Sequence, residues 1–230
     1  MYSFVGARRE GRSPASVVVT KLRILIADDH DVVRSGLRPI LEGQANWAVV
    51  AEARDGKEAI AKAIETEPDI AIVDYSLPLL NGVEVTRQIR ARLPKTEVLI
   101  FTMHDNEMLI QDLLRAGARG YLLKSDARKY IIEAIESLSV HRPFFTTKVA
   151  EAMLQIYAGK QSQTFSPLTN RERTIVQLIA EGHSNKAIAN ILNISVKTVE
   201  THRASVMRKL NCASSADLVR YAIRNKIVEP

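Results

Sequence analysis

The chain has 230 residues, of which 46% are hydrophobic and 25% are charged, and its formal net charge is +6 at pH 7. This composition excludes a chain that is disordered throughout, and the length favours two modest domains over one. The sequence has no run near the roughly 18 apolar residues of a membrane-spanning helix, and its single cysteine, Cys212, excludes an internal disulfide framework and any multi-cysteine zinc site. Low cysteine usage is typical of a reducing compartment, so we expect a cytoplasmic protein with no membrane partner.

Residues 1–20 lack the apolar stretch of about 7–15 residues that a secretory signal needs, and we expect a flexible extension there. From residue 21, short runs rich in Ile, Val and Leu alternate with amphipathic stretches, as in strands buried on both faces and joined by helices. The strand patterns are at 22–27, 47–53, 69–74, 97–102 and 120–124, and the helical patterns are near 30–42, 56–66, 82–92, 105–116 and 127–139. Five such units predict an α/β fold with a doubly wound, five-stranded parallel sheet over residues 21–140.

The rest of the chain shows helical patterns alone. Residues 141–167 predict a linker with one amphipathic helix near 147–157 and a flexible end rich in Gln and Ser. Residues 168–230 predict an all-α domain whose four short helices lie near 170–181, 184–191, 196–210 and 215–225.

Charge is divided unevenly between the two expected domains. Residues 21–140 carry 16 basic and 19 acidic side chains, whereas residues 168–230 carry 10 basic and 5 acidic ones. This division indicates that a polyanionic partner would bind at the C-terminal end. An ordinary solvated surface would carry the same charge, so charge alone leaves both interpretations open.

Polar side chains stand at the carboxyl ends of four predicted strands, where ligands bind in an open parallel sheet. These residues are Asp28, Asp29, Asp74, Thr102 and Lys124. Clustered carboxylates repel one another, and a hard divalent cation such as Mg²⁺ would relieve that repulsion. With the lysine and the hydroxyl, the assembly suits a phosphoryl group that a carboxylate accepts as nucleophile. Each residue alone could simply cap a strand or helix, but the whole set at four strand ends favours a site.

With these residues and the segment DYSLPLLNG (74–82), residues 22–140 resemble a receiver domain of the two-component response regulators. The resemblance implies that Asp74 accepts a phosphoryl group from a histidine kinase, with Pro78 and Gly82 shaping the loop that follows. It also implies a Mg²⁺ site formed by Asp28, Asp29, Asp74 and the backbone carbonyl of Ser76. The remaining residues that it implies are the switch hydroxyl Thr102, the switch aromatic Tyr121 and the lysine of the site, Lys124.

Two further residues lie close to the expected phosphoryl position. Ser76 and His104 come two residues after Asp74 and Thr102, respectively. Our hypothesis is that they tune the lifetime of the phosphoryl-aspartate by admitting or positioning water. Their interpretation as plain loop residues stays equally open.

The segment SNKAIANILNISVKTVETHRASVMRKL (184–210) has the rhythm of a helix–turn–helix, with Ser195 as a predicted N-cap. At 100° per residue, Val199, Val206 and Leu210 fall on one stripe of the helix 196–210. The opposite stripe, which we call the recognition stripe, consists of Lys197, Glu200, Thr201, Ala204 and Arg208. A recognition helix in a DNA major groove requires such a surface, whereas a plain helical bundle would leave it solvated.

Residues 168–227 resemble the LuxR-type helix–turn–helix of the NarL/FixJ subfamily, which implies promoter DNA as a partner and a homodimer after phosphorylation. On the recognition stripe, Glu200 suits a cytosine amino group, and Thr201 and Ala204 suit a thymine methyl group. The residues expected at the phosphates are Lys186, Lys197, Thr198, Arg203, Arg208 and Lys209. Ser195 is expected at the DNA as well, and His202 is expected either at a phosphate or half-buried.

Two alternatives accompany the interpretation as a regulator. A phosphatase or phosphotransferase could also use an aspartyl-phosphate, but such enzymes often carry a second Asp two residues on, where this chain has Ser76. A regulator switched by a small ligand or by dimerisation alone would not need the strand-end carboxylates. For the phosphorylation switch, we expect the receiver to cover the DNA face or the dimer face of the C-terminal domain before phosphorylation.

Overall fold

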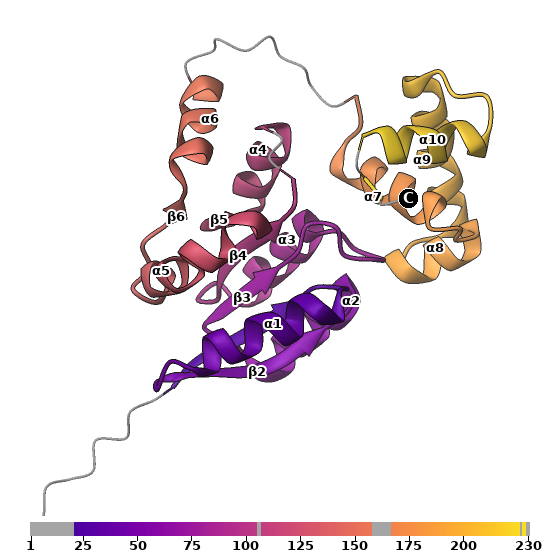
Figure 1. Cartoon of the computed structure of the whole chain (residues 1–230). Coiled ribbons are helices and arrows are strands. Elements are labelled where there is room, and N and C mark those ends of the chain that lie inside the picture. Colours follow the sequence, from indigo (N-terminus) through magenta and orange to yellow (C-terminus); the bar gives the residue numbers. More distant parts are fainter. Residues whose placement is uncertain (1–20, 105–106, 158–166, 226, 229–230) are drawn as a thin grey trace, which may run out of the picture.

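A computed structural model describes residues 21–104, 107–157, 167–225 and 227–228. The extension expected at 1–20 and the flexible end of the linker at 158–166 lie outside the described residues. Within the described part, the elements divide into an α/β part and a helical part (Figure 1).

The α/β part is built on a parallel sheet with the strand order β2-β1-β3-β4-β5-β6. Its strands are β1 (Leu22–Ala27), β2 (Trp47–Ala53), β3 (Ile70–Val73), β4 (Glu97–Thr102), β5 (Gly120–Leu123) and β6 (Phe144–Phe145). The first five confirm the predicted strands, but the prediction of a five-stranded sheet is wrong by one strand. Phe144 and Phe145 pair with Gly120 and Tyr121 at the edge, and two residues are too few to show the alternation by which a strand is recognised.

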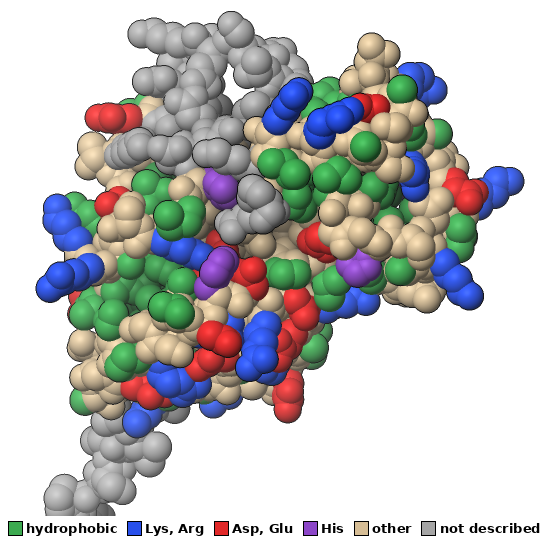
Figure 2. All heavy atoms as spheres, turned by 45° about the vertical axis from the view of Figure 1, so that its right-hand side comes forward, with side chains coloured by type: hydrophobic (Ala, Val, Ile, Leu, Met, Phe, Trp, Pro, Cys, Tyr) green, Lys and Arg blue, Asp and Glu red, His purple; other side chains and the backbone are tan. Residues whose placement is uncertain are grey.

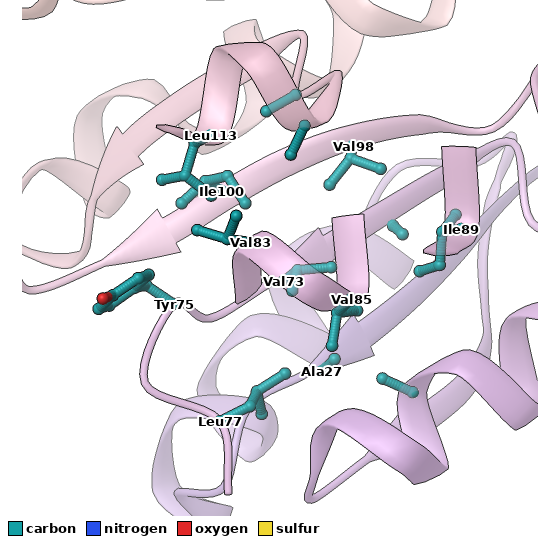
Figure 3. Packing of buried hydrophobic residues seen from close by; sticks show 14 of the residues in the cluster. Ala27, Val73, Tyr75, Leu77, Val83, Val85, Ile89, Val98, Ile100 and Leu113 are labelled. Carbon is teal, nitrogen blue, oxygen red and sulfur yellow. The ribbon is translucent and has the colours of Figure 1, made fainter. Parts of the chain in front are cut away.

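Helices cover both faces of the sheet, as the doubly wound prediction requires. They are α1 (Asp31–Glu42), α2 (Gly56–Thr66), α3 (Gly82–Arg92), α4 (Glu107–Ala116) and α5 (Ala127–Ser139). One buried cluster lies under α2, α3 and α4 and includes Ile100, Val85 and Leu113 (Figure 3). A second cluster lies under α1 and α5. Because the strands contribute to both clusters, their patterns read as nearly continuous apolar runs.

The helix expected in the linker is α6 (Thr147–Tyr157), and it packs against α4. Val149 of α6 is buried in the same cluster as Leu113 of α4. The segment that contains β6 and α6 therefore extends the α/β part instead of crossing open solvent.

The helical part consists of α7 (Asn170–Ala180), α8 (Asn185–Leu192), α9 (Val196–Leu210) and α10 (Ser215–Arg224). Hydroxyl side chains accept a hydrogen bond from the first turn of each helix, and these N-caps are Thr169, Ser184, Ser195 and Ser214. The four helices share a core that includes Leu178, Ile188, Val199, Val206 and Leu218. Across the described residues, none of the helices has both the length and the apolar character needed to span a bilayer.

Candidate phosphorylation site and DNA interface

Two buried carboxylates and a lysine meet at the carboxyl ends of the strands. Asp28 and Asp74 directly follow β1 and β3, which pair in register through Ala27 and Val73, so the two carboxylates lie side by side. The Lys124 ammonium, which follows β5, lies 2.8 Å from Asp28 Oδ2 and 2.9 Å from Asp74 Oδ2. Asp28 and Asp74 are 1% and 2% exposed. The cluster predicted from strand ends is therefore brought together in space.

The same edge carries a set of atoms that can hold a metal ion. Asp28, Asp29, His30 and Asp74 each offer a ligand atom, and these atoms lie within 4.8 Å of one another. Carboxylate oxygens are the ligands that hard divalent cations take, so the donor set fits such an ion. Sequence reasoning did not select His30, whose Nδ1 lies 2.8 Å from Asp29 Oδ1. Its position directly after the acidic pair was the available signal.

The loop after Asp74 ends at Gly82, the first residue of α3, where the backbone returns close to the end of β3. A Cβ atom at this position would lie 2.6 Å from the Asp74 carbonyl oxygen, so a larger residue would push the loop away. The Gly82 backbone N–H also donates to the Tyr75 carbonyl oxygen at 2.8 Å. Gly82, which is expected from the sequence to shape this loop, thus allows two backbone segments to approach more closely than a side chain would permit.

Burial and neighbouring charges set the ionisation of this cluster. Burial raises the pKa of Asp74 to about 6, with Lys124 acting against the rise and Asp28 adding to it. Burial alone would lower the pKa of Lys124, but the carboxylates of Asp74 and Asp28 outweigh it and the net shift is upward. At neutral pH the site therefore holds a carboxylate in surroundings that disfavour its charge.

The raised pKa of Asp74 predicts that Asp74→Asn changes the free energy of unfolding. The folded-state pKa of about 6 lies above the ordinary value of 3.8, so the stabilisation from protonating Asp74 is complete below pH 3.8 and is lost as the pH rises through 6. Removing the charge should raise the free energy of unfolding at pH 7.5 by about 1–3 kcal/mol, and much less at pH 4. Urea denaturation with a metal chelator present measures this. A lower free energy of unfolding for Asp74→Asn at pH 7.5 would contradict the prediction.

The expected switch residues lie next to this cluster. Thr102 ends β4 fully buried, and its Oγ1 accepts a hydrogen bond from the His104 backbone N–H at 3.1 Å. Tyr121 on β5 is 2% exposed, and its hydroxyl donates to the His104 carbonyl oxygen. Ser76 Oγ lies 3.0 Å from His104 Nε2. One residue, His104, therefore connects the two switch positions with Ser76.

The recognition stripe of α9 is open to solvent. Its members, Lys197, Glu200, Thr201, Ala204 and Arg208, are all exposed, as is Lys186 at the start of α8. In Figure 2, several Lys and Arg side chains stand out from the surface at the right of the view. The expectation was that the α/β part covers either the DNA face or the dimer face of the helical part. For the conformation described, the DNA-face alternative is wrong because these side chains are exposed, and the dimer-face alternative stays a prediction.

Other residues expected at the DNA have partners within the helical part. Ser195 Oγ accepts from the Thr198 backbone N–H at 3.0 Å as the N-cap of α9, and His202 is half-buried. Arg203 donates to Asn185 and Ser215, and the Lys209 ammonium lies 2.7 Å from Glu172 Oε2. The Ser195 N-cap was predicted, but the contacts of Arg203 and Lys209 were not predictable from the helical stripe, since their partners come from α7, α8 and α10.

Two family models match the chain. Residues 24–136 match the response regulator receiver domain, and residues 166–222 match the bacterial regulatory proteins of the luxR family. The chain belongs to the LuxR-family response regulators. It is a transcription regulator of the phosphorylation-switched kind, with a receiver domain followed by a LuxR-type DNA-binding domain.

The chain is similar to curated and solved proteins over different shares of its length. The oxygen regulatory protein NreC of Staphylococcus epidermidis is 39% identical over 218 residues, which cover 90% of this chain and all of that protein. A LuxR-family response regulator from Aurantimonas sp. SI85-9A1 is 37% identical with a TM-score of 0.57, covering 60% of this chain and 99% of that one. RcsB from Salmonella enterica, solved on the promoter rprA with the phosphomimetic BeF3-, is 26% identical with a TM-score of 0.62, covering 88% and 98%.

The receiver of this response regulator touches the DNA-binding domain through the loop after Asp74, which reaches across to the helical part in Figure 1. The buried Gln177 side chain of α7 donates to the Leu77 carbonyl oxygen at 2.8 Å and accepts from the Asn81 side chain at 3.2 Å. The Leu79 backbone N–H donates to Glu181 at 3.2 Å. We call this set of contacts the α7 contact. It connects the loop that carries the expected phosphoacceptor directly to the DNA-binding domain.

Proposed function

We propose that Asp74 accepts a phosphoryl group from a histidine kinase in a Mg²⁺-dependent reaction, and that phosphorylation promotes dimerisation and promoter binding through α9. The observation that carries this proposal is the buried Asp74 carboxylate at the strand ends, within 2.9 Å of Lys124 and beside Asp28. Membership of the response regulators supports the same role.

The residues have distinct tasks in this reaction. An Asp74 oxygen forms the new bond to phosphorus while the bond from phosphorus to the donor breaks, and the Lys124 ammonium neutralises charge on the phosphoryl oxygens. The Thr102 hydroxyl is placed to donate to one of those oxygens. Asp28, Asp29, Asp74 and the Ser76 carbonyl would hold Mg²⁺, which supplies further positive charge at the phosphoryl group when bound.

We further propose how this site acts on the rest of the chain. The receiver domain comprises residues 21–140, β6 and α6 begin the connecting segment 141–167, and residues 168–230 form the DNA-binding domain. Phosphorylation adds charge and three acceptor oxygens at Asp74, three residues before the first α7-contact residue, Leu77. A shift of this loop weakens the α7 contact and frees the DNA-binding domain to pair with a second copy. Part of the apolar α10 surface, including Ile223, is exposed and available for such pairing.

Incubation with labelled acetyl phosphate tests the phosphorylation step directly. We expect one phosphoryl group per chain, bound through a linkage that alkali hydrolyses, on a peptide that contains Asp74. Omission of Mg²⁺ should prevent labelling. Steady turnover of a small phosphoester without accumulation of the labelled chain would instead favour the enzyme alternative.

The recognition stripe predicts a salt-dependent contact at Lys197. Lys197→Ala should weaken binding about equally on all DNA sequences and reduce the slope of log affinity against log salt by about 1, because one phosphate contact is lost. Fluorescence anisotropy at several salt concentrations measures both quantities. The control is Lys57→Ala, which removes an exposed lysine from α2 of the receiver. Equal affinities and slopes for Lys197→Ala and the wild type would favour a merely solvated stripe.

A further inference from the structure

We propose that Arg173 of the DNA-binding domain is a positioning residue for the phosphorylation of Asp74, acting through Tyr75 and His104. This inference rests on the proposed function of Asp74. It assigns to the DNA-binding domain a direct effect on the chemistry of the receiver, in addition to the response of that domain to phosphorylation.

The Arg173 side chain projects from α7 into the receiver. Its guanidinium carbon lies 6.0 Å from the centre of the Tyr75 ring, and its Nη1 lies 3.7 Å from Asp112 Oδ2 on α4. The side chain is 15% exposed. Arg173 therefore contacts both the residue directly after the phosphoacceptor and helix α4, at a place largely closed to water.

The Tyr75 ring contacts His104 as well as Arg173. Tyr75 is 2% exposed, and its ring meets the His104 ring edge to face, with centres 5.6 Å apart and planes at 88°. In Figure 3 the Tyr75 hydroxyl points away from the labelled core residues. The contacts with Arg173 and with His104 thus both restrain the Tyr75 ring.

His104 is bonded to the groups that must respond to a phosphoryl group. Its backbone N–H donates to Thr102 Oγ1 at 3.1 Å, and its ring nitrogen Nε2 lies 3.0 Å from Ser76 Oγ. When the Thr102 hydroxyl moves toward a phosphoryl oxygen on Asp74, it must break its bond to His104 or draw that loop along. Because Arg173 secures Tyr75 against His104, it resists this movement.

The direction of the effect follows from this geometry. Through Tyr75 and His104, Arg173 holds Thr102 and Ser76 in the arrangement of the unphosphorylated site, so phosphorylation has to work against this connection. Coupling between two sites is reciprocal in free energy: if phosphorylation weakens the contacts of α7 with the receiver, then these contacts disfavour phosphorylation. Because the Thr102 hydroxyl has to move before it can bond a phosphoryl oxygen, loss of Arg173 should also speed the reaction with a small phosphodonor, for which no kinase contact intervenes.

The test is the initial rate at which the full chain incorporates phosphoryl groups from acetyl phosphate at saturating Mg²⁺. Arg173→Ala should raise this rate roughly fivefold or more over the wild type. Arg171→Ala should leave it unchanged, since Arg171 lies on the same helix but donates to the Leu192 carbonyl oxygen within the DNA-binding domain. Arg173→Lys should behave like Arg173→Ala, because lysine keeps the positive charge near Asp112 but lacks the flat group that lies over Tyr75.

A double variant tests whether Arg173 acts on the site through His104. In a His104→Ala background, Arg173→Ala should produce no further change in the rate, because the connection from Tyr75 is already absent. Equal rates for Arg173→Ala and the wild type would overturn the proposal, as would full restoration by Arg173→Lys or the same increase in both backgrounds. Asp74→Asn is measured in parallel: if that variant is still labelled, the assignment of the phosphoacceptor has failed and not the role of Arg173.

Discussion

Asp74→Asn is expected to abolish the increase in DNA affinity that acetyl phosphate produces in the wild-type chain. The amide has no carboxylate oxygen to attack phosphorus, while the neighbouring Asp28, Lys124 and Thr102 stay in place. If the DNA-competent form rises from 1% to nearly all of the population, the apparent dissociation constant falls by about 100-fold, which is the upper limit for the wild type. In Asp74→Asn the ratio of affinities with and without acetyl phosphate should be 1.

The measurement needs a DNA fragment selected by the protein from a genomic library, followed by anisotropy titrations with and without acetyl phosphate and Mg²⁺. Glu65→Gln is the matched control, because it neutralises an exposed carboxylate on α2, away from the strand ends. This variant should keep the whole increase. If Asp74→Asn kept it too, regulation by a small ligand or by dimerisation alone would be favoured.

Glu172→Gln is expected to cost about 2–4 kcal/mol of the stability of the DNA-binding domain. Glu172 is a 4%-exposed residue of α7 that accepts hydrogen bonds from three side chains, those of Thr169, Ser205 and Lys209. Ser205 and Lys209 belong to α9, so this carboxylate connects α7 to the recognition helix. The amide keeps one acceptor oxygen, but it loses the second acceptor and the negative charge that attracts the Lys209 ammonium.

The stability that the Glu172 carboxylate contributes should decrease in acid. Burial alone would raise the pKa of Glu172, but hydrogen bonds from Lys209, Thr169 and Ser205 outweigh it and lower the pKa to about 2. A folded-state pKa below the ordinary 4.5 stabilises the domain above pH 4.5, and this stabilisation is lost as the pH falls from 4.5 through 2. The difference between Glu172→Gln and the wild type should therefore shrink in acid.

Hydrogen exchange of the α9 amides in the full chain measures this local stability. Glu200→Gln serves as the control, since Glu200 is an exposed acid on α9 and its replacement should change the free energy of opening by no more than about 0.5 kcal/mol. DNA affinity should fall in Glu172→Gln, because α9 loses part of its support. Unchanged exchange at pH 7 would show that the buried carboxylate is dispensable.

The periodicity of the sequence was sufficient to predict the five long strands, the helices between them and the helices of the DNA-binding domain. Parallel strands place their carboxyl ends at one edge, so the positions of Asp28, Asp74 and Lys124 along the chain were enough to predict one cluster. The recognition stripe was predictable for a similar reason, because residues spaced at helical intervals share a face. Both inferences depend only on regular backbone geometry.

The partners of individual side chains were decided by tertiary structure. Lys209 and Arg203 carry the charge expected at a phosphate, yet each is paired within its own domain. Gln177 meets Leu77 and Asn81 across about 100 positions of sequence. Such contacts have no periodic signature, because they depend on the shapes and donors of two separately folded surfaces. The sequence by itself therefore determined the fold, the phosphoryl cluster and the recognition stripe, and only the folded chain decided that α7, with Arg173 and Gln177, faces the loop after Asp74.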